Sequence, residues 1–229
     1  MSLLGFDTST PATSVCVLRA DGELFETRPD AAALTRPPAH ASELMPAVAE
    51  LLRQARVGYE DLEAIAVGVG PGTFTGLRIG VATARGLALA HGLELRPVSS
   101  LAALAAGLAE TLGPARESLS LLPLIDAKRG ELYGALYEGA RERWPAFVAS
   151  PAALVERLRR EDVAPVAAGD GSVRFREVLE AAGVRVEPDR SPAHVVRALH
   201  ICRLAAALAG VAPEAVLPEY LRVPDAKPQ

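Results

Sequence analysis

Two stretches in the first half of the chain carry side chains able to do chemistry. In GFDTST, residues 5–10, Asp7 and three hydroxyl side chains follow an apolar run. This combination suits magnesium and phosphate, because a hard cation prefers carboxylate oxygen and hydroxyls donate to phosphate oxygens. The same residue types also form Asp-Thr turns that bond only to their own backbone. The sequence leaves both interpretations open.

The second stretch, GVGPGTFTGLRIGVATARGLALA at residues 68–90, is a glycine-rich turn between an apolar run and a helical pattern. A Walker phosphate loop needs Gly-Lys-Ser/Thr, and this stretch contains no lysine. The dinucleotide fingerprint also fails, because threonine occupies the place of its third glycine. We therefore favour a structural or docking role for residues 70–76 over an anion site at the start of the following helix.

Hydrophobic periodicity predicts the elements that position these stretches. Asp21-Gly22 is a hairpin signal between two strands, and Ser42 is predicted to cap a helix whose first turn contains Pro46. The predicted elements of the first half are strands at about 2–8, 13–19 and 23–28, a helix at 42–56, a strand at 62–70, a helix at 76–91, a strand at 95–98 and a serine-capped helix at 99–112.

The second half repeats this order, so each half has the pattern βββαβαβα. We predict an α/β fold of two lobes, residues 1–99 and 100–229, with a cleft between them, and a long last helix that packs back on the first lobe. The predicted elements of the second half are strands at 119–129, 130–138 and 143–150, a helix at 150–161, a strand near 164–171, a helix at 173–183, a strand at 184–188 and a helix at about 192–210.

The composition argues against a protein that binds nucleic acid through its overall field, since the formal net charge is -4 and the pI is about 5.7. Any role with RNA is therefore expected to be indirect. The chain has no Asn, and Arg greatly outnumbers Lys. A thermophilic host and a GC-rich genome both produce this bias, and the sequence does not choose between them.

The two cysteines, Cys16 and Cys202, are far apart and have no metal-binding or redox spacing, so they are predicted to be small buried hydrophobes in a reducing compartment. A disulfide between them is not expected from the sequence. The start of the chain, MSLLGFDTST, has no basic leader, and the longest apolar runs are shorter than a membrane span. We expect a cytoplasmic protein without a membrane partner.

The chain resembles the bacterial TsaB (YeaZ) family in its duplicated order of elements and in four motifs. These motifs are GFDTST, GVGPGTFTGLRIGVATARGLALA, IDAKRGELY at 125–133 and PEYLR at 218–222. This family belongs to the actin, Hsp70 and sugar-kinase superfamily, which has a ribonuclease H-like fold. The resemblance covers the whole chain. It implies a non-catalytic scaffold or activating subunit for the synthesis of threonylcarbamoyladenosine at adenosine 37 of tRNA, a tRNA modification.

The resemblance also implies the partners. These are the catalytic subunit TsaD, with which the chain forms a dimer, the small ATPase TsaE, tRNA met mainly through TsaD, and a second copy of the chain when TsaD is absent. The residues themselves leave one alternative open, a small ATPase or kinase that uses Asp7 and the cleft between the lobes.

Superfamily ATPases carry a second acid followed closely by glycine, but here Ala127, Lys128 and Arg129 separate Asp126 from Gly130. The resemblance therefore implies no required cofactor and at most weak, vestigial binding of ATP or ADP with magnesium. The residues predicted to line that nucleotide cleft are Asp7, Thr8, Ser9, Gly169 and Gly171.

On the helix at 76–91, Gly76, Gly80, Ala84 and Ala88 recur at steps of four and form a smooth ridge. Such a ridge admits either an internal helix or sheet or a partner helix. The resemblance favours a partner, which this helix and the helix at 42–56 would join together in a pseudo-symmetric four-helix contact. The predicted interface residues are His40, Leu44, Val48, Thr73, Phe74, Thr75, Gly76, Gly80, Thr83 and Ala84.

No metal site is predicted, because His40 lacks a second imidazole one helical turn away. No local pattern marks a catalytic nucleophile, so no catalytic residue is assigned. The C-terminal PEYLRVPDAKPQ is expected to be a frayed tail after a short anchoring strand or turn.

Overall fold

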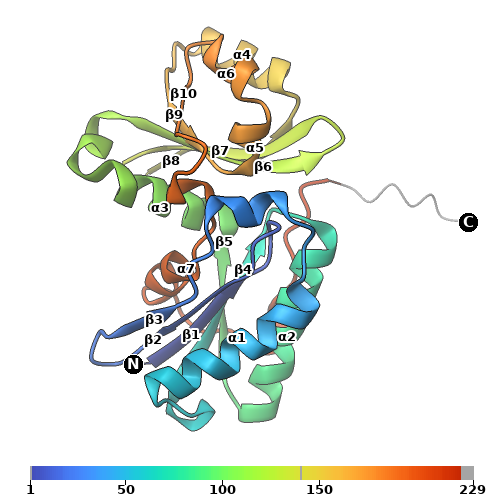
Figure 1. Cartoon of the computed structure of the whole chain (residues 1–229), viewed down its shortest axis with the longest axis vertical. Helices are drawn as coiled ribbons and strands as arrows, with labels where there is room; N and C mark the ends of the chain where they lie inside the picture. Colours follow the sequence, from blue (N-terminus) through green and yellow to red (C-terminus); the bar gives the residue numbers. More distant parts are fainter. Residues whose placement is uncertain (1, 140, 223–229) are drawn as a thin grey trace, which may run out of the picture.

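Two five-stranded sheets with the same strand order build the molecule (Figure 1). The computed structural model describes residues 2–139 and 141–222. The first sheet has the order β3-β2-β1-β4-β5, from β1 (Ser2–Asp7), β2 (Ser14–Leu18), β3 (Leu24–Glu26), β4 (Leu62–Gly70) and β5 (Glu94–Ser99). Written in the matching direction, the second has the order β8-β7-β6-β9-β10, so that β6 takes the place of β1. Its strands are β6 (Ser120–Lys128), β7 (Glu131–Glu138), β8 (Arg141–Ala149), β9 (Val166–Ala168) and β10 (Arg185–Val186).

The helices follow the strands in the same sequence in both halves, which confirms the predicted duplicated α/β fold. The α-helices are α1 (His40–Ala55), α2 (Phe74–His91), α3 (Ser100–Leu112), α4 (Pro151–Arg160), α5 (Asp170–Arg174), α6 (Arg176–Glu180) and α7 (Ala198–Ala205). Short 3-10 helices lie at Ala31–Thr35, Tyr59–Asp61, Gly113–Ser118, Pro192–His194 and Pro213–Ala215.

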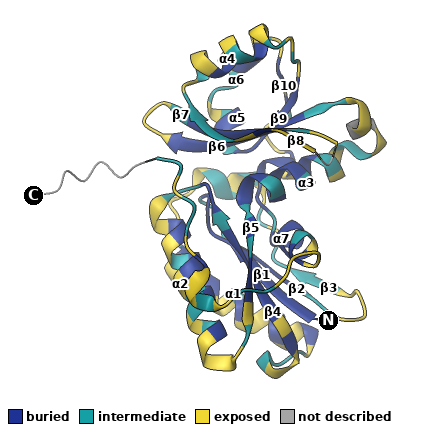
Figure 2. Cartoon of the chain, turned by 180° about the vertical axis from the view of Figure 1, so that it is seen from behind, coloured by how far each residue is buried: buried dark blue, intermediate teal, exposed yellow. Residues whose placement is uncertain are grey.

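Strand alternation assigns the two faces of the first sheet to different helices. In β1, Leu4 and Phe6 belong to the core beneath α1 and α2. Leu3 belongs to the opposite face, together with Ala198 and Cys202 of α7. The first sheet is therefore covered on both faces, and its central strands β1 and β4 are largely buried while the edge strand β3 is half-buried and the outer surfaces of α1 and α2 are exposed (Figure 2).

The helices that end the two halves, α3 and α7, lie between the sheets (Figure 1). Although α7 ends the second half, it packs on β1 and β2 of the first sheet, and α3 packs on β6 of the second. Their apolar faces share one core in which Leu104 of α3, Ile125 of β6 and Ile201 of α7 meet. The predicted division at residue 99 falls between β5 and α3, but these exchanged helices tie the two lobes together.

Local signals predicted some helix ends correctly and others incorrectly. The Ser99 side chain accepts from the Ala102 backbone N–H at 3.3 Å, so the serine cap of α3 is confirmed. The predicted start of α1 is wrong, because its N-cap is Ala39 and the Ser42 hydroxyl instead donates to the Ala39 carbonyl at 3.0 Å. With this earlier start, Pro46 lies beyond the first turn.

The predicted long helices of the second half are also corrected. The last one is only α7, because residues 195–197 connect it in extended backbone to the 3-10 turn at Pro192–His194. Val195 and Val196 are buried in this extended segment, and β-branched side chains favour that conformation. The helix predicted at 173–183 is divided at Phe175 into α5 and α6.

Candidate functional site

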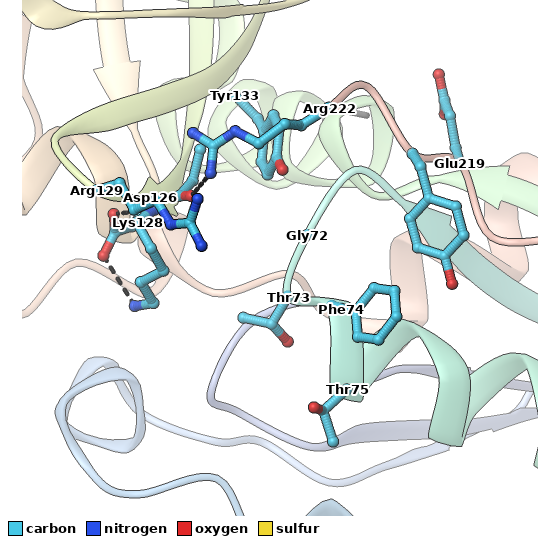
Figure 3. A pocket seen from close by; sticks show the side chains of 12 residues that line it. Gly72, Thr73, Phe74, Thr75, Asp126, Lys128, Arg129, Tyr133, Glu219 and Arg222 are labelled. Carbon is cyan, nitrogen blue, oxygen red and sulfur yellow. Dashed lines mark hydrogen bonds and ion pairs between the residues drawn. The ribbon is translucent and has the colours of Figure 1, made fainter. Parts of the chain in front are cut away.

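A cavity of about 470 Å³ lies between the two lobes, where the loop before α2 faces the β6–β7 hairpin (Figure 3). The cavity combines the start of an α-helix, both signs of charge and aromatic rings. Its lining residues are Gly72, Thr73, Phe74, Thr75, Asp126, Ala127, Lys128, Arg129, Tyr133, Glu219, Tyr220 and Arg222.

Asp126 is the buried acid of this cavity and is held by two cations. Its carboxylate accepts from Lys128 Nζ at 2.8 Å, from the Lys128 backbone N–H at 2.8 Å and from Arg174 at 2.7 Å. Burial alone would raise the pKa of Asp126, but the bonds from Lys128 and Arg174 outweigh it and hold the pKa below its usual value. Asp126 is therefore a charged anchor that fixes the hairpin.

Asp170, at the start of α5, lies behind the same hairpin. It accepts from the Asp126 backbone N–H at 3.0 Å. Burial, with a contribution from the neighbouring Asp126 carboxylate, raises the pKa of Asp170 to about 6. The two acids thus have pKa shifts of opposite sign, because only Asp126 contacts the cations directly.

At the start of α2, Arg78 forms a surface cluster with two aromatic rings. Its guanidinium lies 3.7 Å over the ring of Phe74, and its Nε donates to the Tyr220 hydroxyl at 3.2 Å. The two rings are tilted with centroids 5.5 Å apart, and both are exposed. Arginine and aromatic side chains are enriched at binding hot spots, so this cluster is a candidate contact surface.

The C-terminal segment at residues 216–222 connects the lobes, which corrects the frayed tail predicted from residue 218 onwards as far as residue 222. Val216 is buried in the core of the first lobe, and the Glu219 N–H donates to the Val69 carbonyl at 2.8 Å. Arg222 donates to the Ala127 carbonyl at 3.2 Å and forms an ion pair with Glu131. The apolar Val216 and Leu221 were the signal available in the sequence. Of the tail predicted to fray, residues 223–229 lie outside the described residues.

The acid of the first stretch, Asp7, is sealed inside the first lobe. It is 1% exposed, and its oxygens accept from the Ser9 hydroxyl at 2.6 Å, the Ser9 N–H at 2.8 Å and the Ser100 hydroxyl at 2.7 Å. Burial raises the pKa of Asp7, and the hydroxyl donors only partly offset it. In this arrangement Asp7 joins the end of β1 to the start of α3.

Comparisons with known proteins find a TsaD family model and relatives named TsaB or YeaZ. The family model described as "TsaD: tRNA N6-adenosine threonylcarbamoyltransferase" matches residues 35–172. An uncharacterized protein of Mycobacterium tuberculosis is 35% identical over 99% of this chain and 94% of its own length. The tRNA threonylcarbamoyladenosine biosynthesis protein TsaB of Bacillus subtilis is 29% identical over 99% of this chain and 96% of its own length. The solved structure of YeaZ from Pseudomonas aeruginosa has a TM-score of 0.73 at 30% identity, covering 96% of this chain and 99% of that one.

The chain belongs to the TsaB/YeaZ family.

In this TsaB/YeaZ-family chain, the other residues predicted to bind nucleotide are also engaged internally. The Thr8 hydroxyl donates to the Gly76 carbonyl at 2.7 Å. A Cβ on Gly169, whose φ is +107°, would lie 2.0 Å from the Leu124 carbonyl oxygen, and one on Gly171 would lie 2.9 Å from the Ile125 carbonyl carbon. Both glycines therefore allow the chain to pass close to β6. Nucleotide binding by these residues stays a prediction.

The glycine ridge of α2 faces this chain's own core, which corrects the direction we predicted for it. A Cβ on Gly76 would lie 1.9 Å from the Thr8 carbonyl oxygen, and one on Gly80 would lie 2.4 Å from the Thr8 hydroxyl. Ala84 and Ala88 are buried in the same core. The close approach permitted by these small residues is the contact of α2 with the end of β1.

The predicted interface residues of α1 also point inward. His40, Leu44 and Val48 are each no more than 3% exposed. His40 Nδ1 lies 2.9 Å from the Thr13 hydroxyl, and burial lowers the pKa of His40 despite the nearby Asp7 carboxylate. Among the predicted interface residues, those that retain exposed or half-exposed surface are Thr73, Phe74, Thr75 and Thr83.

The outer face of the two helices is hollowed between their N-terminal ends. A groove of about 800 Å³ is lined by residues 38–42 at the start of α1 and by Thr73, Thr75, Gly76 and Ile79 of α2. Among the exposed apolar side chains of the two helices are Met45 of α1, 41% exposed, and Leu89 near the C-terminal end of α2, 61% exposed. We call this surface the α1–α2 face, defined by the groove with Met45 and Leu89.

Within the described ranges, no group of three or more His, Cys, Asp and Glu side chains is arranged to hold a metal ion. Across the same residues, every helix is too short or too polar to cross a membrane.

Proposed function

We propose that this chain is a non-catalytic subunit that supports threonylcarbamoyl transfer to adenosine 37 of tRNA by docking on a TsaD-type catalytic subunit. The observation that carries the proposal is similarity along nearly the whole chain to a protein named for threonylcarbamoyladenosine biosynthesis. A TsaE-type ATPase and tRNA are the further partners, with tRNA met through the catalytic subunit.

The state of the two strand-end acids supports a non-catalytic role. Both oxygens of Asp7 bond to Ser9 and Ser100 inside the protein, and Asp126 bonds to Lys128 and Arg174. A phosphoryl-transfer site needs carboxylate oxygen free to hold magnesium. Here each acid is used to fix the fold.

The α1–α2 face is the proposed docking surface. Its apolar side chains Met45 and Leu89 are exposed, and the groove at the N-terminal ends of the two helices has room for side chains of a partner. Exposed apolar surface next to a groove is typical of protein interaction sites. The same face is proposed to pair two copies of this chain when the catalytic subunit is absent.

The proposal is tested by reconstitution with TsaD-type and TsaE-type subunits, tRNA, ATP and a preformed, activated threonylcarbamoyl donor. We expect modification of adenosine 37 to require this chain. Unchanged modification when the chain is omitted would remove the central claim. Hydrolysis of magnesium-ATP by the isolated chain, lost in Asp7→Asn, would instead support the small ATPase or kinase.

Surface variants locate the docking site without disturbing the core. Met45→Glu and Leu89→Glu each place a charge on the α1–α2 face, and we expect binding to the TsaD-type subunit to weaken by about tenfold or more. The matched control is Val178→Glu, a residue of α6 in the other lobe that is 47% exposed. Equal binding by all three variants in size-exclusion and calorimetric measurements would place the interface elsewhere.

A further inference from the structure

The only two cysteines of the sequence lie against each other, although 186 positions separate them. Cys16 lies in β2 and Cys202 in α7, and both are fully buried. They belong to the same small core cluster, on the face of the first sheet that α7 covers. Two cysteines placed at random in a chain of 229 residues would rarely be neighbours.

The contact between the two residues is direct. The Cys202 thiol donates to the Cys16 carbonyl oxygen at 3.8 Å. A hydrogen bond with the Cys16 side chain, together with burial, raises the pKa of the Cys202 thiol. The Cys202 side chain therefore contacts residue 16, and both cysteines are free thiols in this state.

A glycine makes the room for this contact. Gly5 of β1 is the cross-strand partner of Cys16, and a Cβ at Gly5 would lie 2.4 Å from Cys202 Sγ. Any side chain at residue 5 would therefore displace the Cys202 thiol from its place beside Cys16. Because Gly5 has no side chain, the Cys202 side chain of α7 can lie over β1 and reach Cys16 in the neighbouring strand.

We propose that Cys16 and Cys202 are a disulfide-forming pair, a covalent modification site that fixes α7 to the first sheet. The oxidant is a low-molecular-weight disulfide such as oxidised glutathione. One cysteine thiolate attacks it, forms a mixed disulfide and releases one glutathione thiolate. The second cysteine thiolate then displaces the other glutathione, so the protein loses two protons and two electrons and the oxidant becomes two thiols.

The surroundings exclude a catalytic thiol and fit a structural bond. The neighbours of the pair are apolar side chains such as Leu3, Ala64 and Ala198, and a raised thiol pKa disfavours the reactive thiolate in the closed state. Oxidation therefore proceeds through local opening of α7, a helix of eight residues. Once formed, the bond stabilises the fold because it closes a loop of most of the chain in the unfolded state.

The test uses the full chain, equilibrated with oxidised glutathione about 10 °C below its melting temperature, then alkylated in guanidinium and digested with trypsin without reductant. We expect a cross-linked pair joining the peptide that ends at Arg19 to the peptide at 198–203. We also expect the melting temperature to rise by about 5 °C or more on oxidation.

Cys16→Ala is the matched control, and it should show neither the cross-linked peptides nor the rise in melting temperature. A Cys202→Ala chain guards against a folding defect in the first variant. The proposal is overturned if both cysteines of the parent chain are still free after oxidation and are fully alkylated. It is also overturned if only glutathione adducts or linked dimers form, or if the internal disulfide forms without raising the melting temperature.

Discussion

The equivalent ends of β1 and β6 carry acids with opposite environments. Asp7 is surrounded by the neutral donors Ser9 and Ser100, and burial raises its pKa. Asp126 occupies the corresponding place in the second sheet, where Lys128 and Arg174 lower its pKa. The same strand order therefore supports a sealed strand end with neutral hydrogen-bond donors in one lobe and an ion-paired strand end in the other.

The difference arises from what packs over each strand end. The residues after Asp7 are covered by α2, whose glycines contact the Thr8 backbone and side chain. The residues after Asp126 form a hairpin that borders the cavity between the lobes. Duplication of a backbone therefore does not duplicate the chemistry, because side chains from other elements decide solvent access and charge.

The seal over the first strand end gives the largest expected effect. In Gly76→Ala the new Cβ would lie 1.9 Å from the Thr8 carbonyl oxygen, so the backbone of β1 or α2 must shift. We expect the free energy of unfolding to fall by about 3 kcal/mol or more, measured by urea denaturation.

Gly86→Ala, on the same helix, is the matched control for that substitution. Gly86 is exposed, and its Cβ would meet nothing within 4 Å. Alanine has the higher helix propensity, so we expect a gain of up to about 1 kcal/mol. Equal effects of the two substitutions would mean that α2 does not seal the end of β1.

The paired acid gives the next effect. In Asp126→Asn the hydrogen bonds from Lys128 and Arg174 no longer end on a charged carboxylate. We expect the free energy of unfolding to fall by about 1–2 kcal/mol near pH 7, and no more, because both cationic side chains are about half exposed. Since the pKa of Asp126 is lower in the folded state, the ionised carboxylate stabilises the fold above the unfolded pKa. This stabilisation is lost as the pH falls through the folded pKa. The loss in the variant should therefore disappear in strong acid.

Asp7→Asn should behave in the opposite way. The folded pKa of Asp7 is raised, so the parent chain loses stability as the pH rises from the unfolded pKa through the folded one. An amide removes this dependence and retains hydrogen-bonding capacity toward Ser9 and Ser100. If denaturation curves across this range show the same pH slope for both variants, the contrast between the two acids is incorrect.

The smallest effect is expected at Asp170, which faces the Asp126 backbone. Its folded pKa of about 6 lies above the ordinary value of 3.8, so the folded state holds its proton more tightly and stability falls as the pH rises between these values. Asp170→Asn retains an acceptor for the Asp126 N–H, and we expect a gain of up to about 1 kcal/mol near pH 7. A loss of stability at this pH, measured by thermal melting, would show that the charge of Asp170 is needed.

The sequence predicted the fold well where one element is specified by its own residues. Alternation in β1, the Asp21-Gly22 hairpin signal and the Ser99 cap each depend on neighbours a few positions away. The prediction of one long last helix failed because the packing of Val195 and Val196 into a distant core overrode a helical pattern. The C-terminal segment was missed for the same reason, since its partners Val69 and Glu131 belong to remote strands.

The duplicated α/β order, the family and the run of small residues in α2 could all be predicted from the residues alone, because periodicity, turn residues and motif spacing are local properties. Packing between distant elements is what places Gly76 and Gly80 against Thr8, seals Asp7 while pairing Asp126 with cations, and brings Cys202 to Cys16. A small residue permits close approach without specifying the neighbour, and the pKa of an acid depends on burial and charges contributed by distant elements. Those properties exist only once the two sheets and their exchanged helices are packed.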